Sequence, residues 1–179
     1  SKDGKTHLVV GNRDIFIPEV SEDSTWSQLP FNTISRDFAF FNPSEKRLAA
    51  IHGDTVNSQD RQYLRWRKLV RHPLFQRFFD LMPSTWVKRI MFRLEAGLKN
   101  TNQAFRIDFP VNEWAEFVKR VSDTLSPDLL IIGHFHPKKI ITLEYGVTKA
   151  LVIPDWHARQ HYLEIEPDLS YTLQQFVKN

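Results

Sequence analysis

Three short apolar segments of this 179-residue chain each run directly into a cluster of glycine and metal-binding side-chain types. Residues 7–10 precede Gly11-Asn12-Arg13-Asp14, residues 48–51 precede His52-Gly53-Asp54, and residues 128–132 precede Gly133-His134-Phe135-His136. Ligands of α/β sheets bind beyond the carboxyl ends of the strands, so we expect the three clusters to converge on one site. We also expect the glycines to let the backbone turn sharply and direct the neighbouring side chains into that site.

The rest of the chain alternates between helical and extended patterns. Residues 18–46 predict irregular structure with edge strands, and residues 59–100 predict helices broken at Pro73 and Pro83. A helix is expected over 111–125, with Trp114, Phe117, Val118 and Val121 on one face, before the buried strand 128–132. Further strands are expected near 139–144, 148–153, 161–166 and 170–177. The order favours an α/β fold in a single domain.

Composition narrows the classes of function. The formal net charge is only +3, so charge alone gives no reason to expect nucleic-acid binding. The absence of cysteine excludes disulfides and thiolate chemistry. No apolar run approaches the ~18–20 residues that span a bilayer.

The donor types in the three clusters indicate which metal they suit. Three histidines, one amide oxygen and two carboxylates favour Mn, Zn or Fe over the all-oxygen cage that calcium prefers. His134 and His136 are two residues apart, and on an extended strand end such side chains project the same way. Each cluster alone is a weak signal, but all three in this order, each behind a strand, predict a metal site.

The ordered motifs Gly-Asn-Arg-Asp, His-Gly-Asp and Gly-His-Phe-His resemble the second half of the calcineurin-like metallophosphoesterase signature. The Arg variant, together with His-Gly-Asp-Thr and a basic helical insert, is most similar to the UDP-2,3-diacylglucosamine pyrophosphohydrolase family of lipid A synthesis. The same family is also matched at Asp60, at Tyr63 and at Trp156-His157. The resemblance implies the C-terminal portion of a β-sandwich flanked by helices, with residues 59–100 as a helical lid.

The resemblance also implies roles for particular residues. Asn12, His52 and His134 would bind one metal and His136 a second, with Mn²⁺ expected and Zn²⁺ or Fe²⁺ as alternatives. The two metals would activate a water that attacks phosphorus in a phosphoester or pyrophosphate bond. Arg13 and His134 would be catalytic, Arg13 by holding phosphate oxygens through bidentate hydrogen bonds. The implied substrate is UDP-2,3-diacylglucosamine or a similar lipid-linked nucleotide sugar.

Substrate contacts are implied outside the metal motifs as well. The residues concerned are Arg13, Asp60, Tyr63, Phe78, Phe79, Lys99, Asn100 and Asn102. The two phenylalanines would line a cleft for acyl chains, and the last three would contact the nucleotide sugar.

The sequence departs from the family's pattern at its beginning. The family carries Asp-x-His and Gly-Asp-x-x-Asp before the Gly-Asn motif, and the second of these supplies the carboxylate that bridges the metals. Only ten residues precede Gly11, and neither motif is among them. We therefore expect residues 1–179 to be an N-terminally incomplete domain whose missing ligands come from an N-terminal segment or a second chain.

Asp155-Trp156-His157 has the Asp-x-His form, which would suggest a circular permutation, but it fits the family's tail better.

The segment 59–100 holds ten Lys or Arg residues against three acidic ones. It has two interpretations: a solvated basic face over a core, or a lid that also lies on an anionic membrane surface. The second interpretation places the protein in the cytoplasm, peripherally attached to the inner face of the membrane.

Three functions compete. The leading hypothesis is the metallophosphoesterase, with the activity of this chain alone left open. A phosphodiesterase or phosphatase with another substrate is the alternative within the fold. An inactive fragment or homologue that binds anionic lipid through its basic helices is the alternative of another class. No nucleic-acid partner is expected, because the basic residues accompany no recognised reading motif.

Overall fold

The computed structural model describes residues 4–12, 14, 30–83, 85–87, 89–90, 92–93, 109–156 and 160–176. The chain divides into two compact units. The first comprises Ser1–Asp54 and Trp114–Asn179, and the second comprises Thr55–Glu113.

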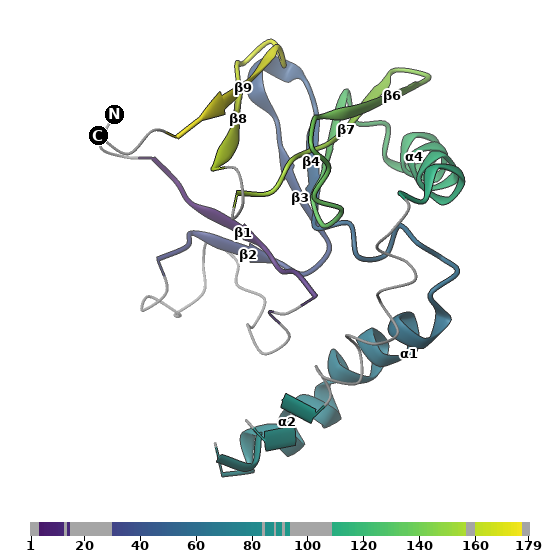
Figure 1. The fold of residues 1–179 in the computed structure, drawn as a ribbon. Coiled ribbons are helices and arrows are strands. Elements are labelled where there is room, and N and C mark those ends of the chain that lie inside the picture. The colour runs from purple at the N-terminus through teal and green to yellow at the C-terminus, as the bar shows by residue number, and fades with distance from the viewer. Residues whose placement is uncertain are drawn as a thin grey trace. The chain divides into compact units, whose positions relative to one another are not determined.

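A five-stranded mixed sheet forms the centre of the first unit (Figure 1). Its order is β3 (Phe38–Phe41), β4 (Leu48–Ile51), β5 (Leu129–Ile132), β7 (Thr148–Val152) and β6 (Ile141–Tyr145). The three central strands are parallel, and the two edge strands are antiparallel to their neighbours. The continuous apolar runs of β4 and β5 suit this position, because central parallel strands are buried on both faces. The mixed α/β class predicted from the sequence is confirmed.

The register of the central strands fixes where their following loops begin. Ile51 pairs with Ile132, and Ile132 pairs with Val152, so β4, β5 and β7 end in one row. Because the three strands are parallel, their carboxyl ends lie at the same edge of the sheet. The loops that begin at residues 52, 133 and 153 therefore start side by side.

One face of the sheet packs against an antiparallel hairpin formed by β8 (His161–Ile165) and β9 (Tyr171–Gln175). The buried residues on this face are Leu48, Leu129 and Leu151. Leu163, Ile165 and Tyr171 of the hairpin pack against them. The Lys149 ammonium lies 5.1 Å from the centre of the Tyr171 ring, on the same face of β7 as Leu151.

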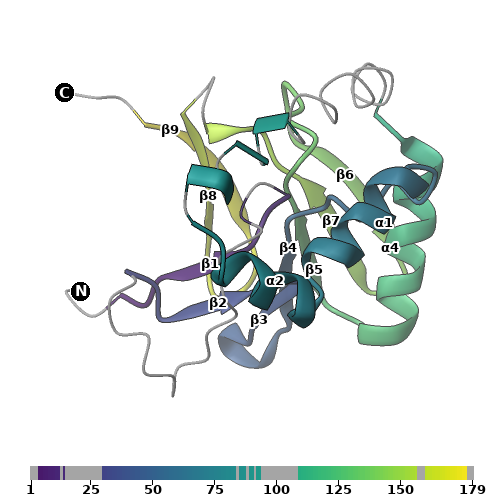
Figure 2. The same ribbon diagram turned by 90° about the horizontal axis from the view of Figure 1, so that it is seen from below.

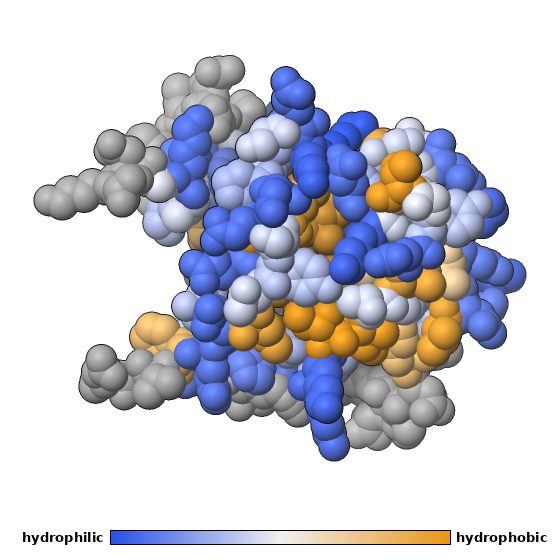
Figure 3. Space-filling view, turned by 90° about the horizontal axis from the view of Figure 1, so that it is seen from above, coloured by the Kyte–Doolittle hydropathy of each residue, from blue (hydrophilic) through white to orange (hydrophobic). Residues whose placement is uncertain are grey.

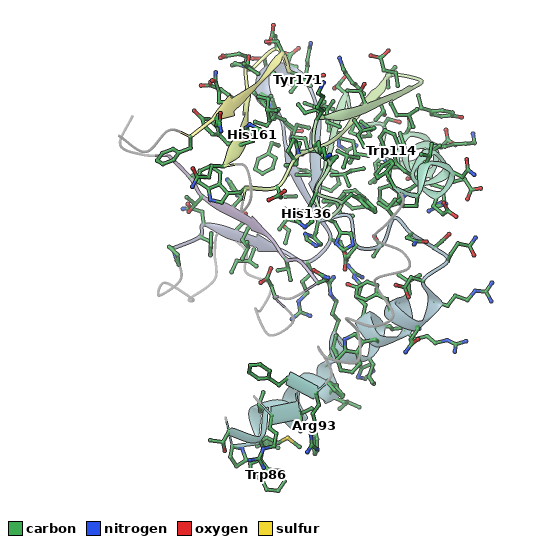
Figure 4. All side chains as sticks on the ribbon, in the orientation of Figure 1. Trp86, Arg93, Trp114, His136, His161 and Tyr171 are labelled. Carbon is green, nitrogen blue, oxygen red and sulfur yellow. The ribbon has the colours of Figure 1, made fainter. Side chains whose placement is uncertain are left out.

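Helix α4 (Val111–Leu125) lies beside β6 and β7 in both ribbon views (Figures 1 and 2). Its predicted apolar face, Trp114, Phe117, Val118 and Val121, is buried. Ser122 joins this face and donates a hydrogen bond to the Tyr145 carbonyl, while the Thr148 hydroxyl donates to the Ser122 hydroxyl. Trp114 on α4 and Tyr171 on β9 lie on either side of the sheet (Figure 4).

A second, two-stranded parallel sheet joins β1 (His7–Val9) and β2 (Thr33–Ser35). Val10 and Ile34 form its buried core, with Leu8 and Phe31 packed against them. A short 3-10 helix, η1 (Pro43–Glu45), links β3 and β4. Residues 30–46 are the described part of the region 18–46, in which edge strands were expected. The strands found there are β2 and β3.

The surface of the first unit is mixed. Figure 3 shows hydrophilic side chains over much of one face and apolar side chains gathered in a continuous patch across its lower half. Phe40, on the edge strand β3, is one exposed aromatic, and the Arg47 guanidinium lies 4.9 Å from the centre of its ring. Val147 in the β6–β7 turn is 71% exposed.

The regular elements described in the second unit are helices. It contains α1 (Arg61–Val70) and α2 (Pro73–Asp80), and Pro73 opens α2, which confirms the predicted break there. Asp60 caps α1, its carboxylate accepting the Tyr63 backbone N–H at 2.9 Å. Trp86 and Arg93 belong to a further helical stretch (Figure 4). None of the described helices combines the length and apolar character needed to cross a bilayer.

Candidate metal-binding site

The loops that follow β4 and β5 bring two predicted ligands together. His52 follows β4 and His134 follows β5, and their strands are adjacent and in register. The Nε2 atom of His52 lies 3.2 Å from the Nδ1 atom of His134. The two rings meet edge to face, with their centres 5.1 Å apart. The convergence predicted from the parallel strands is therefore present for this pair.

The separation of these two nitrogens fits shared coordination of one metal ion. A divalent transition metal binds imidazole nitrogen at about 2.0–2.1 Å. With nitrogen–metal–nitrogen angles of 90–110°, two such ligands lie about 2.8–3.4 Å apart. The observed 3.2 Å falls within that range. Both rings are partly buried, and the same separation also suits a hydrogen bond in which one ring N–H donates to the nitrogen of the other ring.

The loop after β1 packs directly on His52. Gly11 is buried, and a Cβ atom there would lie 3.0 Å from Cε1 and 3.1 Å from Nδ1 of the His52 ring. The Asp14 carboxylate accepts the Gly11 N–H at 3.0 Å, and the Gly11 carbonyl accepts the Asp14 N–H at 3.3 Å. These two bonds close the turn that carries Asn12, the third predicted ligand. All three predicted clusters thus meet at His52.

The glycines of the three clusters serve different purposes. Gly53 has φ +101°, and a Cβ atom there would lie 2.6 Å from Ile132 Cγ2, so only glycine suits the position. Gly133 has no left-handed φ; a Cβ atom there would lie 3.2 Å from the His52 carbonyl oxygen. The prediction that the glycines allow sharp turns is confirmed at Gly53, and the chain also turns sharply at Gly133, whose carbonyl accepts the Phe135 N–H at 2.8 Å. Glycine is favoured at Gly133 because the His52 backbone approaches it closely.

The two histidines of the third cluster do not continue the strand. β5 ends at Ile132, and His134 and His136 both adopt left-handed backbone conformations, with φ of +69° and +51°. The prediction that they project the same way from an extended strand end is therefore wrong. His134 faces His52, whereas the His136 Nδ1 atom faces the Asp155 carboxylate at 4.0 Å. Left-handed conformations are uncommon outside glycine and cluster at functional sites.

Asp155 lies beside a predicted ligand, although in the sequence it stands out only as part of an Asp-x-His motif to which no role in the site is assigned. It lies in the loop after β7, and its side chain is 12% exposed, whereas that of His136 is 66% exposed. The signal available in the sequence was the position of Asp155 after an apolar strand. What brings it beside His136 is the adjacency of β5 and β7 in the sheet.

Acidic groups accompany the histidines in the other clusters too. Asp54 is buried, 4% exposed, two residues after His52, and Asp14 closes the first loop. Within the described part of the chain, however, no three His, Asp or Glu side chains gather closely enough to hold a metal together. The described geometry therefore supports one histidine pair, and the coordination by Asn12 and His136 remains a prediction.

The predicted substrate contacts lie mostly in the second unit. Asp60 acts as the α1 cap, Tyr63 is buried and Phe78 is exposed. Arg13, Lys99, Asn100 and Asn102 lie outside the described residues, as does the side chain of Phe79. All of these remain predictions as substrate contacts.

The chain is similar along most of its length to proteins named UDP-2,3-diacylglucosamine hydrolase. It is 25% identical to that of Vibrio cholerae serotype O1 over 173 residues, covering 93% of this chain and 67% of the relative. Identity to that of Neisseria meningitidis serogroup C is 30% over 151 residues, covering 84% and 59%. Identity to that of Vibrio atlanticus is 27% over 170 residues, covering 94% and 67%. The chain thus spans 59% to 67% of the length of these relatives. No family model matches it.

Proposed function

We propose that this chain, a distant homologue of the calcineurin-like UDP-2,3-diacylglucosamine hydrolases, carries part of the active site of a metal-dependent pyrophosphohydrolase. The proposed substrate is UDP-2,3-diacylglucosamine or a similar lipid-linked nucleotide sugar. On this proposal the first unit is the C-terminal portion of the metallophosphoesterase β-sandwich, and residues 59–100 form its lid.

The approach of His52 to His134 is the observation that carries the proposal. Two imidazole nitrogens 3.2 Å apart at the carboxyl ends of adjacent parallel strands suit one divalent metal. The donor set of imidazoles and the Asn12 amide favours a transition metal such as Mn²⁺. The neighbouring carboxylates add negative charge that would attract a cation to the same edge of the sheet.

Each ligand has a distinct proposed role. Asn12, His52 and His134 hold one metal, and His136 contributes to a second. When bound, such metals acidify water and polarise phosphoryl oxygens. Arg13, next to Asn12 in the chain, binds the phosphate oxygens through its planar guanidinium. Water adds to one phosphorus and the P–O–P bond breaks, which yields UMP and a diacylated sugar phosphate.

The helical unit supports a lipid-linked substrate. Exposed apolar side chains recur along it, and Phe78 and Leu81 are 56% and 84% exposed. They alternate with exposed basic residues such as Arg77, Arg89 and Arg93. Basic amphipathic helices with exposed aromatic groups bind anionic membrane surfaces. We propose that this unit brings the active site to the membrane and contacts the acyl chains.

Product analysis tests the pyrophosphohydrolase directly. The chain is incubated with UDP-2,3-diacylglucosamine and Mn²⁺, and the products are identified by mass spectrometry. We expect UMP and the diacylated sugar phosphate in equal amounts, lost in His134→Ala and retained in His72→Ala, whose histidine lies in the helical unit. Release of inorganic phosphate or UDP would contradict the proposed bond cleavage.

The same helices favour a second candidate function, a lipid-surface module without catalysis. This candidate predicts that vesicle binding persists in His52→Ala and His134→Ala without metal, and that the chain forms no products from the nucleotide sugar. Vesicle binding together with metal-dependent hydrolysis would favour the enzyme, because the module forms no products from the nucleotide sugar.

A further inference from the structure

The loop after β7 holds an acidic side chain against a predicted metal ligand. Asp155 Oδ2 lies 4.0 Å from His136 Nδ1, and the Asp155 side chain is largely buried while that of His136 is largely exposed. The two residues follow adjacent parallel strands that end in register, at Ile132 and Val152. The fold, and not the local sequence, therefore brings this carboxylate to the imidazole.

We propose that Asp155 is a positioning residue for His136. A carboxylate facing Nδ1 favours the tautomer that carries its proton there, which leaves Nε2 with a free lone pair. Ligand histidines in metalloproteins commonly donate their second N–H to a carboxylate in this way, which fixes both tautomer and ring orientation. A closing movement of about 1 Å, or one bridging water, would complete the bond from the observed 4.0 Å.

The exposure of the two side chains assigns the roles. The His136 side chain is 66% exposed, so few neighbouring groups fix the orientation of its ring. Its left-handed backbone, with φ +51°, already places it off the strand direction. Asp155, 12% exposed, is the fixed partner. Asp155 thus supplies the orientation that the packing around His136 does not.

This inference rests on the proposed function, which makes His136 a metal ligand. The first test of the inference needs no bound metal. Nitrogen-15 NMR of the metal-free chain at a fixed alkaline pH reports which ring nitrogen of His136 carries the proton. We expect the Nδ1–H tautomer to dominate in the wild type and to lose its dominance in Asp155→Asn. Glu144→Gln, which removes an exposed carboxylate on β6, serves as the matched control and should leave the tautomer unchanged. An unchanged tautomer in Asp155→Asn would overturn the inference.

The second test is a double-mutant cycle on Mn²⁺ affinity, measured by isothermal titration calorimetry. We expect Asp155→Asn to weaken Mn²⁺ binding about 10–100-fold. In a His136→Ala background the same substitution should have little further effect, because its action passes through the imidazole. An equal loss in both backgrounds would overturn the positioning role and would make Asp155 a ligand or a folding residue. If the wild type binds no Mn²⁺, the proposed function fails and the tautomer measurement alone decides this inference.

Discussion

His52 Nε2 lies 3.2 Å from His134 Nδ1, although 82 residues separate the two histidines in the chain. The pairing of β4 with β5 explains this proximity, because each histidine lies just beyond the end of its strand, His52 immediately after Ile51 and His134 two residues after Ile132. The loop after β1 then packs its Gly11 against the His52 ring. The site is therefore held by the sheet and by backbone contacts between loops.

Gly11→Ala tests the contact between the first loop and the histidine pair. The new methyl group would lie 3.0–3.1 Å from two atoms of the His52 ring, so the ring must shift by a few tenths of an ångström. We expect Mn²⁺ affinity to fall several-fold, because metal–nitrogen distances must stay within about 0.2 Å of 2.0–2.1 Å and a shift of a few tenths of an ångström exceeds that. Gly4→Ala is the control, since nothing lies within 4 Å of its added Cβ. Equal Mn²⁺ affinities by calorimetry in the two variants would refute the contact.

Gly53→Ala should destabilise the first unit more than Gly146→Ala does. Both glycines have a positive φ, which costs a residue with a Cβ about 1–2 kcal/mol. At Gly146 the nearest atom to the added Cβ is 3.6 Å away, so only this backbone cost applies. At Gly53 the Cβ would also overlap Ile132 Cγ2 at 2.6 Å, which adds about 1–3 kcal/mol of overpacking.

Urea unfolding of the two variants measures that difference in the free energy of unfolding. We expect about 2–5 kcal/mol of destabilisation for Gly53→Ala and about 1–2 kcal/mol for Gly146→Ala. Similar values for both would mean that the loop after β4 does not pack on β5 as described.

The sequence predicted the strands of the sheet well, because their apolar runs are short and each ends in polar residues. It also predicted that His52 and His134 would meet, since parallel strands share one carboxyl edge. It did not predict the contact of Asp155 with His136, which depends on β7 lying next to β5. Nor did it predict left-handed conformations at His134 and His136, because such conformations are uncommon at any residue other than glycine.

The helical unit makes a separate prediction about lipid surfaces. Replacing Phe78 and Leu81 together with Ser should weaken binding to vesicles that contain phosphatidylglycerol by about tenfold or more, because both apolar side chains are exposed. Val147→Ser, which removes an exposed apolar side chain from the β6–β7 turn, is the control and should bind as the wild type does. Co-sedimentation at low and high salt provides the measurement, with weaker binding expected at high salt.

Three results would contradict this prediction. The Phe78→Ser/Leu81→Ser variant could bind vesicles as well as the wild type does. That result would mean that these two side chains do not contribute to membrane binding. A comparable loss in Val147→Ser would show that exposed apolar side chains contribute without regard to the basic helices. Binding that does not depend on salt would exclude attraction by the basic residues.

The most direct measurement is the amount of Mn²⁺ retained per chain after loading and desalting, determined by elemental analysis for the wild type, His52→Ala, His134→Ala and His72→Ala. We expect the wild type and His72→Ala to retain the metal, and both site variants to lose it, because His52 and His134 face the same point between adjacent strands. Retention of Mn²⁺ in both site variants, or no retention in the wild type, would contradict the assignment of a metal to this histidine pair.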